Sequence, residues 1–208
     1  LDRKKFLVYA YPKKDIWQEQ HMEEYVDALR RVDPDVTGAP VQVFESSRLM
    51  HEGFLLAALY SFILVFVLLL VDFRSLKLAL VTIIPVAVGV FWTLELMPII
   101  GWSFNLANFF ALPIMIGCGV DAGVHMVHRF RETRSVAEVG RTTGSAVTLA
   151  NLSNMVGFAS MGIARHQGVA SLGLVTALGC FTVLVASVVL LPCFLELLKG
   201  RLLPKEEP

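Results

Sequence analysis

Long apolar stretches, separated by short charged loops, constrain this chain more than any other feature. Residues 54–71 are 18 consecutive uncharged positions, and residues 167–195 also contain no Asp, Glu, Lys or Arg. A helix of about 20 apolar residues crosses a hydrocarbon core of roughly 30 Å, and a helix satisfies its own backbone hydrogen bonds in lipid. The pattern therefore predicts five transmembrane helices, at about 54–71, 77–97, 104–128, 143–164 and 168–198.

Composition agrees with a membrane protein and excludes several other classes. The chain is 55% hydrophobic, above the roughly 45–50% of soluble domains. Its net charge is zero and its basic residues are scattered, which argues against a nucleic-acid partner. No nucleotide-binding loop, nucleophile motif or metal-ligand spacing occurs, so we expect no enzyme activity, no metal and no cofactor. Cys118, Cys180 and Cys193 fall in apolar runs and are interpreted as small buried hydrophobes.

The segment before the first apolar run carries much of the charge. Within residues 1–53, 5–11 and 40–44 have the composition of strands, and a helix capped by Asp15 is expected to run to about Val32. This predicts a small βαβ unit outside the membrane, the end of a larger extracytoplasmic domain. The predicted fold class is thus an all-α multi-pass membrane protein with a small α+β (βαβ) N-terminal stub.

Charge in the short loops predicts the orientation. Nine basic residues fall in the loops after the first and third spans and in the tail 199–208, whereas the opposite loops contain only Arg165. By the positive-inside rule the first set is cytoplasmic. Residues 1–53 are then expected on the periplasmic side of a bacterial inner membrane, with residues 54–198 as the transmembrane domain.

The third apolar run contains an acid. Asp121 in "GCGVDAGVHMVHRFRE" lies about 12 Å along a helix from the edge marked by Arg129. A charge at that depth costs roughly 2.5–3.5 kcal/mol, so such residues usually face a bundle interior and act. His125 and His128 share the face of Asp121. Reversible protonation suits this line, because burial raises a carboxyl pKa and histidine titrates near neutral pH.

Neighbouring residues complete the predicted relay. Gly117, Gly119 and Gly123 are expected to let another helix approach beside Asp121 and exclude water. Polar residues of the next span can hold the carboxyl by hydrogen bonds, and we assign them to the relay: Thr148, Asn151 and Asn154.

Plainer roles remain open for these residues. Asp121 and His125 could each satisfy a structural partner in the bundle, His128 could be an interfacial residue, and the asparagines could be ordinary interhelical polar contacts. Asp72, Glu95 and Glu196 lie at helix ends, where interfacial water makes a charge cheap, and we assign them no chemistry.

These motifs resemble a known family. "GCGVDAGVHMVHRFRE", followed by "NLSNMVGFASMGIARHQGVASLGLVTALG", is similar to the second transmembrane half of the resistance-nodulation-division (RND) superfamily. It looks most like the MMPL-type, lipid-exporting branch, which includes bacterial hopanoid exporters. The resemblance covers about residues 40–198. It departs in one respect, since many relatives have tyrosine directly after the acid and this chain has Ala122.

The resemblance implies a twelve-helix, proton-driven exporter of lipids, hopanoids or similar molecules, of which this chain is the C-terminal half. The implied partners are a lipid substrate, the membrane, the N-terminal half of the same transporter with a matching acid, and, as alternatives, a second or third copy in a homodimer or homotrimer. Two other functions remain open: a SecDF-like auxiliary of protein translocation, and a sterol-sensing-type receptor that binds lipid without pumping it.

Overall fold

A computed structural model describes residues 8–16, 19–105 and 107–202. The chain divides into two compact units, residues 1–52 and 53–208, and each is described by itself. Five helical segments are long and apolar enough to cross a membrane, which confirms the predicted number among the described residues. They are α2 (Ala39–Phe73), α3 (Leu76–Ile99), η1 with α4 (Asn108–Phe110 and Ala111–Thr133), α5 to η3 (Val136–Ile163) and α7 (Gln167–Leu202).

The predicted βαβ unit is wrong. Residues 8–11 form no strand, while Lys5–Leu7 lie outside the described residues, and the segment 40–44 is the start of α2. Proline is tolerated in the first helical turn, so Pro40 does not prevent the helix. Val41 packs with Met22 and Val26 of α1 (Glu19–Val32). This contact with a helix, rather than cross-strand pairing, decides the conformation of a segment whose β-branched residues suggested a strand.

The predicted helix of the N-terminal segment is present as α1. Its described part begins at Glu19, after Asp15, and ends at Val32 as predicted. Arg30 in its last turn forms an ion pair of 2.6 Å with Glu45 of α2. Along α2, Arg48 pairs with Glu45 at 3.2 Å. Local helical pairs of this kind support α2 well ahead of the predicted start at residue 54, and Gly53 does not interrupt the helix.

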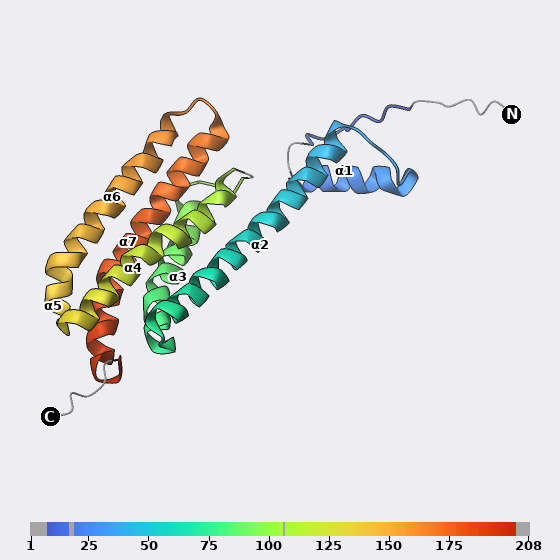
Figure 1. The fold of residues 1–208 in the computed structure, drawn as a ribbon. Helices are drawn as coiled ribbons and strands as arrows, with labels where there is room; N and C mark the ends of the chain where they lie inside the picture. The colour runs from blue at the N-terminus through green and yellow to red at the C-terminus, as the bar shows by residue number, and fades with distance from the viewer. Residues whose placement is uncertain (1–7, 17–18, 106, 203–208) are drawn as a thin grey trace. The chain divides into compact units, whose positions relative to one another are not determined.

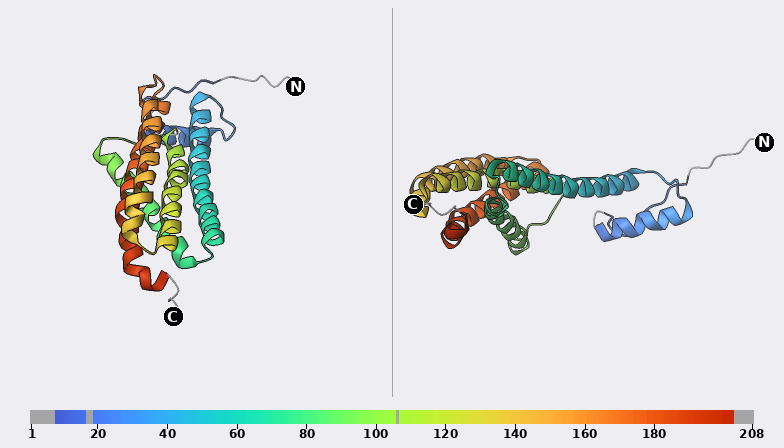
Figure 2. Two further views of the ribbon diagram at one scale, coloured as in Figure 1. Left: turned by 60° about the vertical axis from the view of Figure 1, so that its left-hand side comes forward. Right: turned by 60° about the horizontal axis from the view of Figure 1, so that its bottom comes forward.

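Helix α7 is the centre of the second unit. In the most apolar stretch of α7, about 61% of the residues are buried. The corresponding share is 6% for α2 and 11% for the span that contains α6 (Ser145–Ser160). It packs against α3, α4 and α6, and Figure 1 shows α4 and α6 running alongside it with α3 behind. Figure 2 shows the same bundle from two other sides. The surfaces of α2 and α6 are therefore the outer layer of this unit, and their exposed Leu, Ile and Val side chains suit lipid.

A reciprocal pair of asparagines sets the start of the third span. Asn105 Oδ1 accepts the Asn108 backbone N–H at 3.0 Å, and Asn108 Oδ1 accepts the Asn105 N–H at 2.8 Å. This is the geometry of a capping box, with amides in place of the usual hydroxyl and carboxylate. Both side-chain amides also donate to Ser171 Oγ of α7, at 2.8 and 2.9 Å. The helix therefore begins at Asn108 rather than at the predicted residue 104, and we name these two residues and Ser171 the asparagine box.

The other span boundaries differ from the prediction mainly by helix beyond the apolar run. Helix α4 continues to Thr133 rather than 128, and α7 continues to Leu202, into the predicted tail. The fourth span begins with α5 (Val136–Val139) and the π-helical turn η2 (Gly140–Gly144), ahead of the predicted residue 143. These additions are polar turns that keep their backbone hydrogen bonds after the apolar run has ended, which hydropathy alone does not detect.

Candidate functional site in helix 4

Close packing through glycine fixes which face of α4 is covered. A Cβ on Gly123 would lie 2.9 Å from Thr82 Cγ2 and 3.1 Å from its carbonyl oxygen, and one on Gly119 would overlap the Val183 side chain. These glycines therefore bring α4 against α3 and α7, as small residues do at helix interfaces in membranes. Gly117 has nothing within 4 Å of such a Cβ and makes no packing contact of this kind with the described residues.

The covered face lies opposite the predicted relay. Asp121, His125 and Gly117 are all exposed on the surface of this five-helix unit, and His128 is half-buried. Among the described residues, Asp121 and His125 have no hydrogen bond or ion pair. The expectation that Gly119 and Gly123 would bring a helix beside the carboxylate therefore needs correction, because they approach neighbours on the far side of α4. By packing against α3 and α7, these glycines fix the rotation of α4 about its own axis. The face that carries Asp121 therefore points away from α3 and α7.

The polar residues predicted in the next span do not gather around Asp121. The Thr148 hydroxyl donates to Gly144 O at 2.7 Å, and the Asn151 amide donates to Val147 O at 3.0 Å. Both side chains thus satisfy backbone carbonyls of their own helix, a common alternative to interhelical bonding. Asn154 is exposed. Within the described structure, none of these three side chains hydrogen-bonds the Asp121 carboxylate.

A histidine–carboxylate contact that sequence reasoning did not predict joins α2 to α4. His128 Nε2 lies 2.6 Å from Asp72 Oδ2, and the ring of Phe73 lies 5.0 Å, centroid to centroid, from the imidazole. Asp72 had been assigned no chemistry, and its only sequence signal is its position at the end of an apolar run. The pair connects residues 56 positions apart, which one sequence cannot reveal.

A cavity of about 590 Å³ lies beside these histidines, between α4 and the start of the fourth span. Its polar lining is His125, His128, Arg129, Glu132, Thr142 and Thr143. A water molecule occupies about 30 Å³ in the liquid, so the cavity has room for several. Among the described residues no three His, Cys, Asp or Glu side chains come together as a metal site would require.

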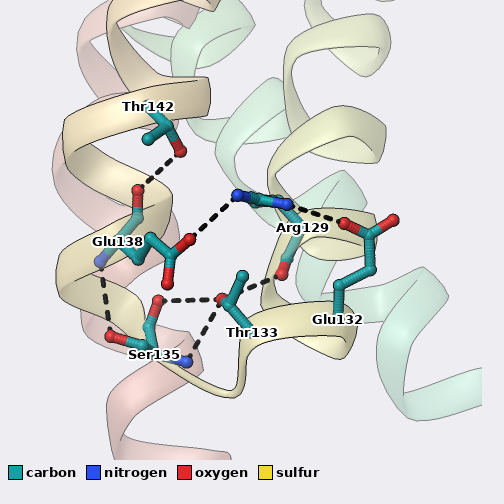
Figure 3. Close-up of polar contacts among 6 residues, drawn as sticks. All are labelled: Arg129, Glu132, Thr133, Ser135, Glu138 and Thr142. Atoms are coloured by element: carbon teal, nitrogen blue, oxygen red, sulfur yellow. Dashed lines mark hydrogen bonds and ion pairs between the residues drawn. The ribbon is translucent and has the colours of Figure 1, made fainter.

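Arg129 forms a clasp over the turn between α4 and α5 (Figure 3). Its guanidinium contacts Glu132 at 3.1 Å and Glu138 at 2.8 Å. The Thr133 hydroxyl donates to Arg129 O at 3.0 Å, and Ser135 caps α5 by accepting the Glu138 N–H at 3.4 Å. The clasp fixes the angle at which the fourth span leaves α4, and so the walls of the adjacent cavity.

The clasp should contribute little to stability. The Arg129 and Glu138 side chains are 36% and 46% exposed, and exposed ion pairs contribute about 0.2–1 kcal/mol. A double-mutant cycle with Arg129→Gln and Glu138→Gln, measured by thermal unfolding in detergent, should give a coupling energy in that range that falls in high salt. Glu132→Gln is the matched control, because it removes the other carboxylate that contacts Arg129. A coupling above about 2 kcal/mol would contradict a solvent-screened pair.

Helices of membrane length, packed through glycine and carrying a line of ionisable residues on one face, define a multi-pass membrane protein with a polar face at mid-span. The chain belongs to the MMPL family, whose match covers residues 14–207. This confirms the family predicted from the sequence.

Individual relatives agree with the family match. The chain is similar to the hopanoid transporter HpnN of Burkholderia multivorans (30% identity, 82% of this chain and 19% of that protein) and to HpnN of Rhodopseudomonas palustris (27%, 90% and 22%). It is also similar to the membrane protein YdfJ of Bacillus subtilis (26%, 82% and 24%). The chain thus spans about a fifth of the length of these relatives. No solved structure matches it.

Proposed function

We propose that this chain is the second transmembrane half of a proton-motive-force-driven exporter of lipids, hopanoids or similar molecules. Membership of the MMPL family and the similarity to two hopanoid transporters support this proposal. In it, the basic ends of α4 and α7 lie in the cytoplasm. Residues 1–53 lie in the periplasm, and lipid moves from the inner membrane outward.

One observation carries the proposal: Asp121 is exposed on the outer face of a membrane-length helix. Left against acyl chains, a carboxylate there would cost several kcal/mol. This cost disappears if the other half of a longer transporter covers the face of Gly117, Asp121 and His125. The chain spans about a fifth of the length of the hopanoid transporters, which agrees with a longer protein. Gly117, which has space around it, would allow close approach of that half.

A covered carboxyl at this depth can convert proton movement into conformational change. The ionised form requires water or a cation beside it, whereas the protonated form tolerates an apolar neighbour. Protonation from one side and release to the other therefore favours two different packings of the Asp121 face in turn. Each proton that crosses supplies about 2.3 kcal/mol per 100 mV of membrane potential.

Reconstitution of the full-length protein tests the proposal. Vesicles that contain it and a radiolabelled hopanoid should transfer the lipid to acceptor vesicles only under an imposed proton gradient, and a protonophore should stop the transfer. Empty vesicles are the control. Lipid binding that ignores the gradient would instead indicate a receptor. Normal lipid distribution with defective protein secretion in a deletion strain would indicate a translocation auxiliary.

A further inference from the structure

We propose that Asp72 and His128 form the exit end of the proton path, passing protons from the Asp121 line to water at the Arg-rich end of the bundle. The inference rests on the proposed function and extends it by a residue pair from a second helix. The contact of 2.6 Å between His128 Nε2 and Asp72 Oδ2 is the observation that carries it.

Spacing along α4 brings the proton close to this pair. His125 lies four residues after Asp121, and His128 three residues later, so the rise is roughly 6 Å and then roughly 4.5 Å on about the same face. Both histidines line the cavity of about 590 Å³, where water can bridge gaps that side chains do not span. The path from Asp121 to Asp72 therefore consists of ionisable groups and a cavity large enough for several water molecules.

The geometry of the imidazole suits transfer rather than storage. Nε2 faces Asp72, so a proton that arrives at Nδ1 leaves a ring with both nitrogens protonated, and the Nε2 proton then passes to the Asp72 carboxylate. The ring returns to neutral as the Nδ1–H tautomer and Asp72 releases the proton to water; exchange of the ring proton from Nδ1 to Nε2 through water readies the pair for the next proton. The His128 and Asp72 side chains are 40% and 47% exposed, so water reaches both, and the Phe73 ring at 5.0 Å restricts the orientation of the imidazole.

Charges around the pair favour proton transfer from His128 to Asp72. On α4, the positive charge of Arg129 is opposed by Glu132 and Glu138 in the clasp, which weakens its repulsion of a charged His128. The other titratable neighbour on α4 is His125, and the fourth span lines the cavity with the uncharged Thr142 and Thr143. Arg74 directly follows α2, and Lys77 lies in the first turn of α3. Among the described residues, Asp72 is thus the carboxylate within ion-pair distance of the His128 ring.

Asp72→Asn in the full-length transporter tests the inference. The substitution keeps the shape and a hydrogen-bond acceptor but removes the charge. We expect proton-coupled lipid transfer at neutral pH to fall at least about tenfold and its pH profile to change, because no carboxylate is left beside Nε2 to take up the proton. Asp72→Glu should restore most of the rate and the original profile. Glu196→Gln is the matched control, because it removes an exposed carboxylate near the C-terminal end of α7. It should change neither the transfer rate nor the pH profile.

The outcomes separate this inference from the proposed function. If Asp72→Asn transports at the wild-type rate with an unchanged pH profile while Asp121→Asn is inactive, the exit pair is wrong and the exporter stands. A loss of transport that is equal at every pH, with a lower unfolding temperature and no rescue by Asp72→Glu, would show that the pair only stabilises the fold. That result would also overturn the inference. If Asp121→Asn retains full proton coupling, the proposed function itself fails.

Discussion

Asp121→Asn is expected to reduce proton-coupled lipid export by the full-length protein by about a hundredfold or more, while the protein still inserts into the membrane. Asparagine has nearly the same shape but does not titrate, and a positioned proton-transfer group typically contributes about 10²–10⁴-fold. In the full-length protein the other half is proposed to cover the Asp121 face, and an amide of nearly the same shape fits the same space. The free energy of unfolding should therefore be unchanged. The measurement is gradient-driven lipid transfer in vesicles beside thermal unfolding in detergent.

Two variants make this result specific. Glu95→Gln removes an exposed carboxylate near the end of α3 and should leave transport unchanged, because that position is close to interfacial water. Asp121→Glu keeps a titrating carboxyl and should keep part of the activity. Export by Asp121→Asn at more than about a third of the wild-type rate would refute a proton-carrying role for this residue.

Gly89→Val should produce the largest loss of stability of any single substitution considered. A Cβ at this position would lie 2.7 Å from the Val183 backbone nitrogen and closer still to its Cα, so the obstacle is a helix backbone that no rotamer change can move. The Gly89 carbonyl also accepts hydrogen bonds from Thr93 and Thr182, at 3.0 and 2.9 Å. Forcing α3 from α7 breaks this cluster as well as the packing. We expect a cost of about 3 kcal/mol, the upper end for overpacking.

Thermal unfolding of the purified full-length protein checks this expectation. Gly157→Val is the matched control, because nothing lies within 4 Å of a Cβ there and the same side chain is added to a helical glycine. Its effect should stay within about 0.5 kcal/mol. Equal midpoints for the two variants would mean that α3 and α7 do not pack through Gly89.

Hydropathy predicted the membrane part of the fold well and its margins poorly. The apolar runs indicated five spans because lipid permits few other structures. Their ends were shifted because polar turns such as those of the clasp continue the helices by hydrogen bonding alone. The predicted strand at residues 40–44 failed because Val41 is buried by contacts with Met22 and Val26, which lie far enough away in sequence that local propensity gives no sign of them.

For the candidate site, the sequence indicated the residues of α4 and little of their surroundings. The cost of an acid at mid-span singled out Asp121, and helical spacing linked it with His125 and His128. The direction of that face depends on which glycines meet α3 and α7, and Gly117, Gly119 and Gly123 look alike in sequence. The contact of Asp72 with His128 depends on how α2 meets α4, which no local pattern encodes.

The asparagine box has a practical consequence for labelling this protein. Asn105 and Asn108 anchor the start of the helix to Ser171 of α7. This anchor, and not the connection before it, therefore sets the position and rotation of α4. Gly101, with φ +79° and no atom within 4 Å of where a Cβ would lie, is in that connection. A short tag or fluorophore inserted beside Gly101 should therefore report on the protein without rotating the acidic helix.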